Sequence, residues 1–206
     1  ARPESETLAI IGAGVQARDH IAAIHCVRDL RQTYLAARDR AQAERLIEDM
    51  SAVDPAIRDI TICESSDQAV AQADIVCTVT TSAEPVFSAD AIRPGTHINA
   101  VGSYQPHTVE IPGETVKAAR VFVDHRASAL EEAGDLIVPL ESGLIDASHI
   151  LGEVGEVLAG SIAGRRSASD ITLFKSVGCA AEDCLAASEV LARAKALGIG
   201  EETTLI

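Results

Sequence analysis

The chain has 206 residues, of which 47% are hydrophobic and only 2% aromatic, so it has room for one large domain, or one domain plus an appendage, with an aliphatic core. Such a core suits a buried parallel sheet flanked by helices. The formal net charge of −14, from 17 basic and 31 acidic side chains, makes nucleic acid and anionic membranes poor partners.

Strand-like and helix-like segments alternate from the start of the chain to residue 124. Short β-branched and aliphatic runs predict strands at residues 7–11, 33–36, 59–63, 74–79, 96–101 and 121–124. Helical spacing predicts helices at residues 16–28, 40–50 and 66–71, the second of them capped by Asp39. Aliphatic strands that alternate with helices indicate an α/β fold with a doubly wound parallel sheet.

The rhythm changes after residue 124. Helical patterns cover residues 128–133 and 153–159, a polar loop follows at 160–169, and residues 171–174 form a further strand candidate. A long Ala-rich helix at 179–197 is closed by Gly198. We therefore expect residues 1–175 to form the sheet domain and residues 176–206 a C-terminal helical extension.

A glycine-rich turn joins the first strand to the first helix. Gly12 permits the tight turn, Gly14 lets the backbone approach a pyrophosphate, and Ala17 allows the helix to pack close to the strand. The free N–H groups at the helix start then face the anion. A lone GxGxxA pattern is weak evidence, but its place between a strand and a helix favours a Rossmann-type NAD(P)-binding domain over a purely structural glycine turn.

The end of the second strand bears on the choice between NAD and NADP. Ala37 stands where an acid that bonds the ribose 2′-hydroxyl is expected, and the fork-shaped cation of Arg38 beside it suits a 2′-phosphate. NADP(H) is therefore favoured over NAD(H). In the alternative interpretation, Arg38 and Arg40 are solvated charges at a helix start and Asp39 is merely an N-cap.

Several segments along nearly the whole chain are together far more specific than the glycine turn. They are residues 11–17, 80–82, 94–106, 130–136 and 172–178. On these segments the chain resembles the ornithine cyclodeaminase/μ-crystallin family, whose members are NAD(P)-dependent enzymes that handle an amino or imino acid. The resemblance implies a small amino or imino acid as substrate, and a homodimer.

The resemblance also implies roles for residues at the carboxyl ends of strands, where ligands bind in open α/β sheets. Val15 and Gln16 would contact the diphosphate, and Thr80 would line the cofactor. The residues expected beside the nicotinamide are Asn99, Ala100, Val101 and Ser176. Val177 and Gly178 would lie on the substrate side.

One departure from the family pattern bears on the reaction. Where the cyclodeaminases carry a proton-transferring Asp, two residues after Gly102, this chain has Tyr104. Tyr has a higher reference pKa and no standing negative charge, so it can donate a hydrogen bond but holds a second ammonium group poorly. Reduction of a cyclic imino acid, of the Δ1-pyrroline-2-carboxylate or Δ1-piperideine-2-carboxylate type that ketimine reductases use, is therefore favoured over cyclisation of ornithine.

His107 is the second catalytic candidate after Tyr104, because a histidine can relay a proton near neutral pH. A role on the loop surface is the alternative for it. Two further functions stay open beside the reductase: a cyclodeaminase-type lyase that releases ammonia while NAD is recycled internally, and a non-catalytic NADP-binding module of the crystallin type.

A second departure concerns the region ahead of the glycine turn. Family members have an N-terminal substrate and dimerisation region there, which contains their substrate-carboxylate Arg and catalytic Lys, and we expect it to be missing from this sequence. The C-terminal helical extension would pack towards that region.

The remaining polar residues have simpler interpretations. We expect His97 to be a satisfied core or edge histidine, and the acidic residues Glu131, Glu132 and Asp135 to form a solvated helix face. Glu153 and Glu156 are assigned structural roles. Lys175 could contact phosphate or be a surface charge on a strand.

Five cysteines are scattered along the chain without a CxxC or a Cys/His zinc spacing. We expect core thiols, no metal site and a cytoplasmic protein. The sequence shows no secretory signal, and no apolar run reaches membrane-spanning length.

Overall fold

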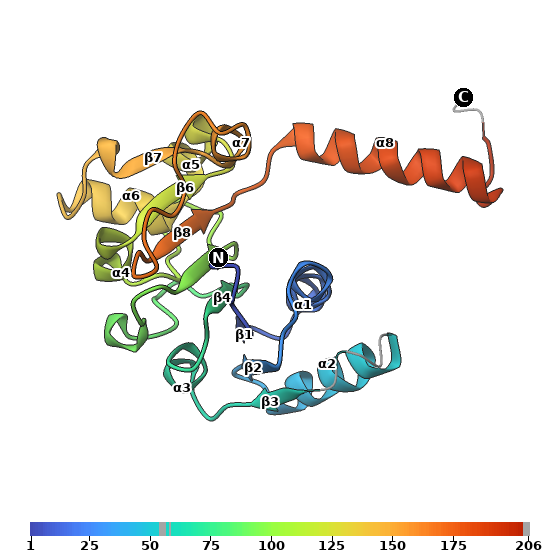
Figure 1. Ribbon diagram of the computed structural model, residues 1–206, viewed down its shortest axis with the longest axis horizontal. Coiled ribbons are helices and arrows are strands. Elements are labelled where there is room, and N and C mark those ends of the chain that lie inside the picture. Colours follow the sequence, from blue (N-terminus) through green and yellow to red (C-terminus); the bar gives the residue numbers. More distant parts are fainter. Residues whose placement is uncertain (54–56, 58, 204–206) are drawn as a thin grey trace.

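A computed structural model describes residues 1–53, 57 and 59–203. Its centre is an eight-stranded sheet in the order β3-β2-β1-β4-β5-β8-β6-β7, and every neighbouring pair is parallel. Figure 1 shows helices on both sides of the sheet. The α/β fold with a doubly wound parallel sheet, expected from the alternation of strands and helices, is confirmed.

The strands are β1 (Thr7–Ile11), β2 (Gln32–Ala36), β3 (Ile60–Ile62), β4 (Ile75–Thr78), β5 (His97–Ala100), β6 (Arg120–Val123), β7 (Ile150–Glu153) and β8 (Thr172–Lys175). The α-helices are α1 (Val15–Val27), α2 (Arg40–Val53), α3 (Ser66–Val70), α4 (Gly113–Ala118), α5 (Arg126–Glu132), α6 (Gly134–Glu141), α7 (Val154–Leu158) and α8 (Ala180–Leu197). Two short 3-10 helices are η1 (Ala89–Ala91) and η2 (Ala147–His149).

The elements missed in the sequence are β7, α4, α6 and the two 3-10 helices. The segment of β7 has only a short apolar run before Gly152, and its last residue, Glu153, is also the N-cap of α7, where it forms a capping box with Glu156. The helical pattern therefore obscured the strand. Helix α6 contains Pro139, and a proline inside a segment argues against a helix when only residue propensities are considered.

Alternation along β1 divides the first half of the molecule into two cores, because successive strand side chains point to opposite faces. Leu8 and Ile10 pack with Ile21 of α1 and with α2. Ala9 and Ile11 pack on the opposite face, where α3 lies. Helices therefore bury both faces of the sheet around β1.

The second half, β5 to β8, is covered differently. The core that begins beside α3 continues through Ile98, Val121 and Leu173 to the helices α4, α5 and α6. Over β6 on the other face, Arg120 donates hydrogen bonds to the carbonyl oxygens of Ala163 and Gly164, which belong to the predicted polar loop. On that face the loop takes the place that α1 and α2 have in the first half.

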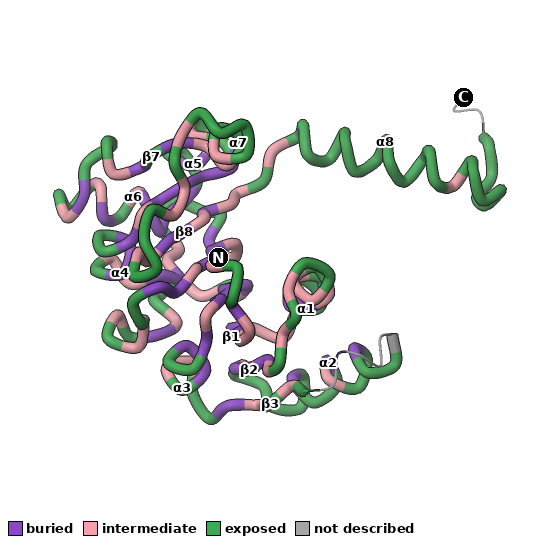
Figure 2. The backbone as a smooth tube through the Cα atoms, in the orientation of Figure 1, coloured by how far each residue is buried: buried purple, intermediate pink, exposed green. Residues whose placement is uncertain are grey.

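Helix α8 contains no buried residue. It leaves the end of β8 and extends away from the sheet (Figure 1), and its tube is coloured as exposed along nearly its whole length in Figure 2. Its exposed apolar side chains include Leu185, Val190, Leu191 and Leu197. In the described part of the chain no helix has both the length and the apolar character needed to cross a membrane.

Candidate functional site

The glycine turn between β1 and α1 has the geometry expected of it. Gly12 has φ +116°, a conformation that favours glycine, and a Cβ there would lie 2.8 Å from the carbonyl oxygen of Val79. Gly14 is the N-cap of α1 and, as a glycine, has no side chain to cap the helix. A Cβ there would meet no atom within 4 Å. The buried Ala17 lets α1 pack against β1. The space beside Gly14, at the start of α1, is therefore open.

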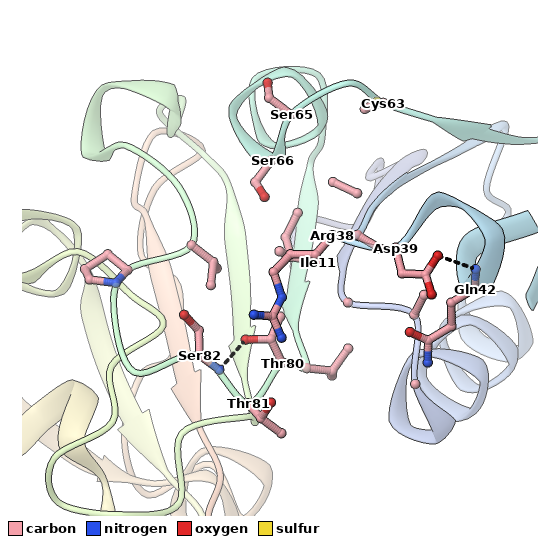
Figure 3. A pocket seen from close by; sticks show the side chains of 18 of the residues that line it. Ile11, Arg38, Asp39, Gln42, Cys63, Ser65, Ser66, Thr80, Thr81 and Ser82 are labelled. Carbon is pink, nitrogen blue, oxygen red and sulfur yellow. Dashed lines mark hydrogen bonds between the residues drawn. The ribbon is translucent and has the colours of Figure 1, made fainter.

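A cleft of about 630 Å³ lies beside this turn, between the ends of β2 and β4. Five residues predicted from the sequence line it: Gly12, Gly14, Ala37, Arg38 and Thr80. Figure 3 shows the side chain of Arg38 reaching into the cleft, whereas the Asp39 carboxylate turns towards α2. Asp39 Oδ1 accepts hydrogen bonds from the backbone N–H groups of Ala41 and Gln42, so the interpretation of Asp39 as a cap is confirmed.

Further polar residues on the cleft wall were not predicted. Ser65 and Ser66 lie at the start of α3, and Ser65 Oγ accepts a hydrogen bond from the backbone N–H of Gln68. On the opposite wall, Thr80 Oγ1 accepts a hydrogen bond from the backbone N–H of Ser82 at 3.0 Å (Figure 3), which closes the Thr80–Ser82 turn. The cleft thus presents the Arg38 cation, several hydroxyl groups and the start of α1, beside the acidic residues Asp39, Glu64 and Glu84. The cation, the hydroxyl groups and the helix N-terminus suit an anionic and hydroxylated ligand.

A second cavity, of about 500 Å³, lies at the carboxyl ends of β5 and β8, next to α1. The predicted residues that line it are Gln16, Asn99, Val101, Tyr104, Ser176, Val177 and Gly178. The sequence reasoning missed His20, Ile24 and Phe174. The first two could have been found, because they follow Gln16 by four and eight residues and therefore share its helix face.

The structure does not bring every predicted site residue to a cavity. Val15 is 78% exposed at the start of α1, and His107 is exposed on the loop after β5. Ala17 and Ala100 are fully buried in the two cores. None of these four lines either cavity described above.

The floor of the second cavity is fixed by Asp124, which follows β6. Its Oδ2 accepts hydrogen bonds from Ser176 Oγ at 3.0 Å and from the backbone N–H groups of Val177 and Gly178 at 2.8 and 2.6 Å. Charge-assisted bonds of this kind are short and strong. The sequence reasoning assigned Asp124 only to the end of a strand, because its partners lie more than fifty residues away.

His97 is a satisfied histidine within the sheet, as expected. Burial is the main cause that lowers its pKa to about 3, so the ring is neutral at physiological pH. Nε2 must carry the proton, because it lies 3.2 Å from the acceptor oxygen of Asn99, and Nδ1 then accepts a hydrogen bond from Thr172 Oγ1 at 2.8 Å. This chain of hydrogen bonds orients Asn99, which lines the second cavity.

Two expectations about charged residues are wrong. Lys175 and Asp135 are both 0% exposed, and Lys175 Nζ lies 3.1 Å from Asp135 Oδ2. Lys175 therefore neither contacts a phosphate nor lies on the surface, and Asp135 does not belong to a solvated face. Glu131 and Glu132 are exposed, as expected. The correction has a physical reason: a buried charge is tolerated when it is paired, and a pairing forty residues apart leaves no local pattern.

Cys63 and Cys77 are buried, as expected for core thiols, whereas Cys26 and Cys184 are exposed and Cys179 is half-buried. All five are free thiols. Among the described residues no group of three or more His, Cys, Asp or Glu side chains is arranged to hold a metal ion.

Known proteins share this arrangement. A family model described as "Ornithine cyclodeaminase/mu-crystallin family" matches residues 1–198. The chain belongs to this family. A Δ1-pyrroline-2-carboxylate reductase from Bacillus cereus is 38% identical over 98% of this chain and 61% of its own length, and the ketimine reductase mu-crystallin of Rattus norvegicus is 36% identical over 91% of this chain and 55% of its own length.

Among solved structures, the Thermococcus litoralis Δ1-pyrroline-2-carboxylate reductase in complex with NADH and L-proline superposes with a TM-score of 0.94. It is 38% identical, and the match covers 98% of this chain and 62% of that protein. The chain thus spans about three fifths of the length of these family members.

Proposed function

We propose that this chain is the cofactor-binding part of an NAD(P)H-dependent reductase that acts on a cyclic imino acid of the Δ1-pyrroline-2-carboxylate or Δ1-piperideine-2-carboxylate type. The observation that carries the proposal is the pair of cavities at the carboxyl ends of the strands. One is bounded by the glycine turn and Arg38, and the other by Asn99, Tyr104 and Ser176. The relatives named above, two reductases of this imino acid and a ketimine reductase, support it.

The residues of the first cleft fit a nicotinamide dinucleotide. The open space at the Cβ position of Gly14 leaves room for a diphosphate to approach the free amides of α1. A nicotinamide near Asn99, Val101 and Ser176 would supply the hydride. What the chain itself supplies is placement: Asp124 holds Ser176, and His97 orients Asn99.

At the substrate, a hydride is added to the carbon of the C=N bond and a proton to its nitrogen. The protonated iminium is the better hydride acceptor, so a hydrogen-bond donor near the ring nitrogen helps the reaction. Tyr104 lines the second cavity and has a hydroxyl group to donate, whereas the floor of Val177 and Gly178 presents little polar side-chain surface. This arrangement favours reduction over release of ammonia.

The preferred cofactor would be NADP(H). Arg38 lines the cleft, Ala37 offers no carboxylate for a ribose 2′-hydroxyl, and Asp39 is engaged in capping α2. We expect Arg38→Ala to weaken NADPH binding about 10- to 100-fold and NADH binding by less than about threefold, since a charged hydrogen bond contributes about 1.5–3 kcal/mol. Calorimetric titration with both coenzymes measures this.

Arg40→Ala is the matched control for Arg38→Ala, because Arg40 is exposed and pairs with Glu44 on α2. Equal losses for NADPH and NADH in Arg38→Ala would contradict the NADP(H) preference. They would leave dinucleotide binding as such intact.

The reaction is tested by mixing the full-length protein with NADPH and Δ1-pyrroline-2-carboxylate and following the absorbance of the reduced nicotinamide. We expect the absorbance to fall only when the imine is present. Release of ammonia from ornithine without net change of cofactor would instead indicate a lyase. Tight cofactor binding without turnover of any cyclic ketimine would indicate a non-catalytic module.

We further propose that residues 1–175 form the dinucleotide-binding domain and that α8, within residues 176–206, packs against the substrate and dimerisation region of a homodimer in the cytoplasm. The exposed Leu185, Val190 and Leu191 support this, because a helix in water that buries none of its apolar residues gains little from folding alone. The free thiols are compatible with a reducing compartment.

A further inference from the structure

Glu110 is a fully buried carboxylate between β5 and α4, and it joins two turns that the mechanism above leaves separate. Its Oε1 accepts a hydrogen bond from the backbone N–H of Thr80 at 2.6 Å, and its Oε2 accepts one from the backbone N–H of Gly102 at 2.8 Å. Thr80 opens the turn after β4 and lines the first cleft. Gly102 lies in the turn after β5 that leads to Tyr104 in the second cavity.

The space around Gly102 shows that the two turns are fitted around this carboxylate. A Cβ at Gly102 would overlap the carbonyl oxygen of Thr80 and would lie 2.5 Å from Glu110 Oε1. Only a residue without a side chain allows such a close approach of two backbone segments. In addition, the backbone carbonyl of Glu110 accepts a hydrogen bond from the N–H of Val86, which also lines the first cleft.

The same network reaches the end of β8. Asp135, at the start of α6, accepts hydrogen bonds on Oδ1 from the backbone N–H groups of Glu110 and Ile111 at 2.7 and 2.9 Å. Its Oδ2 pairs with Lys175, the last residue of β8, which directly precedes Ser176. Two buried carboxylates and one buried ammonium group thus connect the ends of β4, β5 and β8.

These buried charges are costly for the fold. Burial, and to a lesser extent the nearby Asp135 carboxylate, raises the pKa of Glu110, while hydrogen bonds from Thr80 act in the opposite direction, so placing a carboxylate here has a cost in stability. A hydrophobic residue of similar size would avoid that cost but could not accept two backbone N–H groups at once. The arrangement therefore has its value in fixing the positions of the turns.

We infer that Glu110 is a positioning residue that holds the Thr80–Ser82 turn and the Gly102–Tyr104 turn at a set separation, and so aligns the cofactor cleft with the substrate cavity. The structural part of this inference stands on the hydrogen bonds of Glu110. Its consequence for turnover rests on the proposed reductase function.

The direct test is amide hydrogen exchange, which needs neither cofactor nor substrate. In Glu110→Gln the side chain has one carbonyl oxygen left, so its amide N–H₂ group faces one of the two backbone N–H donors. We expect exchange at Thr80 and Gly102 to become at least about tenfold faster, and faster still in Glu110→Ala, since a buried hydrogen bond to this side chain is lost at each step. Amides of β1 should exchange as in the wild type.

Glu114→Gln is the matched control, because Glu114 is exposed on the neighbouring helix α4. Unchanged exchange at Thr80 and Gly102 in Glu110→Gln would overturn the inference. A uniform rise that includes the β1 amides would also overturn it, since it would show general destabilisation rather than release of two turns.

The functional readout uses the full-length protein. We expect Glu110→Gln to lower kcat about tenfold or more while the KM for the coenzyme rises by less than about threefold, because misalignment acts on the transition state more than on binding. Loss confined to KM would overturn the role in alignment. If the wild type turns over no imine, the proposed function fails, whereas the exchange experiment still decides whether Glu110 holds the turns.

Discussion

The first and second halves of the sheet enclose their cavities in different ways. Around β1 and β4, helices bury both faces, and the cleft is made by the glycine turn and by the segments that follow β2, β3 and β4. At β5 and β8, the second cavity has α1 on one side and the anchored Ser176–Gly178 segment on the other, and the following helix α8 buries nothing. The glycine turn of the first half is therefore set by local sequence, whereas the second cavity depends on long-range contacts and is followed by a helix that leaves apolar surface uncovered.

The largest effect that sharpens this comparison is expected at the glycine turn. Because a Cβ at Gly14 meets nothing within 4 Å, Gly14→Ala should change the free energy of unfolding by less than about 0.5 kcal/mol. A methyl group in the open space should nevertheless weaken dinucleotide binding about 100-fold, which corresponds to about 2.7 kcal/mol. Calorimetry and thermal unfolding measure the two quantities.

Two other glycines bracket the result for Gly14. Gly12→Ala should destabilise the fold by about 1–3 kcal/mol or more, since it combines a positive φ with a clash against Val79. Gly155→Ala in α7, where a Cβ also meets nothing within 4 Å, should alter neither property for the worse. Wild-type affinity in Gly14→Ala would break the claim that the first cleft is the dinucleotide site.

A smaller, pH-dependent effect is expected on β5, where the two halves meet. The pKa of His97 is lowered by burial from 6.5 to about 3, so within that window the unfolded chain binds a proton that the folded chain does not. The contribution of His97 to the free energy of unfolding is thus fully present above pH 6.5. It is lost as the pH falls, with a slope of at most about 1.4 kcal/mol per pH unit.

His97→Gln should therefore flatten the loss of stability between pH 6.5 and 4, although it costs stability at pH 7 through its altered hydrogen bonds. Denaturant unfolding at several pH values measures this slope. His107→Gln, on the exposed loop, serves as control and should keep the wild-type slope. An unchanged slope in His97→Gln would show that the ring is protonated in the folded protein.

The smallest effect is expected on α8. Leu191 is 55% exposed, so Leu191→Glu should change the stability of this chain by less than about 0.5 kcal/mol. If α8 packs in the proposed homodimer, the same change in the full-length protein should shift the elution volume in size-exclusion chromatography from dimer to monomer. A marked loss of stability in the chain itself would show that α8 packs on the sheet, and would remove the contrast between the two halves.

The sequence allowed the first half to be predicted in detail because its signals are local. The run of β1, the glycines at 12 and 14 and the cap at Asp39 all act on residues within a few positions, and both Arg38 and Thr80 line the cleft. The spacing of Gln16 and His20 on one helix face carried a further signal that was not used.

The second half resisted prediction because its determinants are distant in sequence. Lys and Asp are residue types that usually lie on the surface, and only the fold reveals that Lys175 and Asp135 form an ion pair in the core. Glu110 and Asp124 likewise act on backbone amides that belong to other strands. No period or motif in one sequence encodes such pairings. The resemblance to a family pointed to the segments around Asn99 and Ser176, but it gave no contacts between side chains.

The anchoring by Asp124 ends abruptly, and this has a consequence for how the molecule can be divided. Gly178 is the last residue whose amide Asp124 holds; it has φ +90°, and a Cβ there would meet nothing within 4 Å, so the chain changes direction here without packing against its surroundings. This position is a suitable junction for chimeras in which the C-terminal segment with α8 is exchanged between relatives. The Ser176–Gly178 segment that lines the second cavity would be carried over intact, while the grafted C-terminal helix could adopt its own angle.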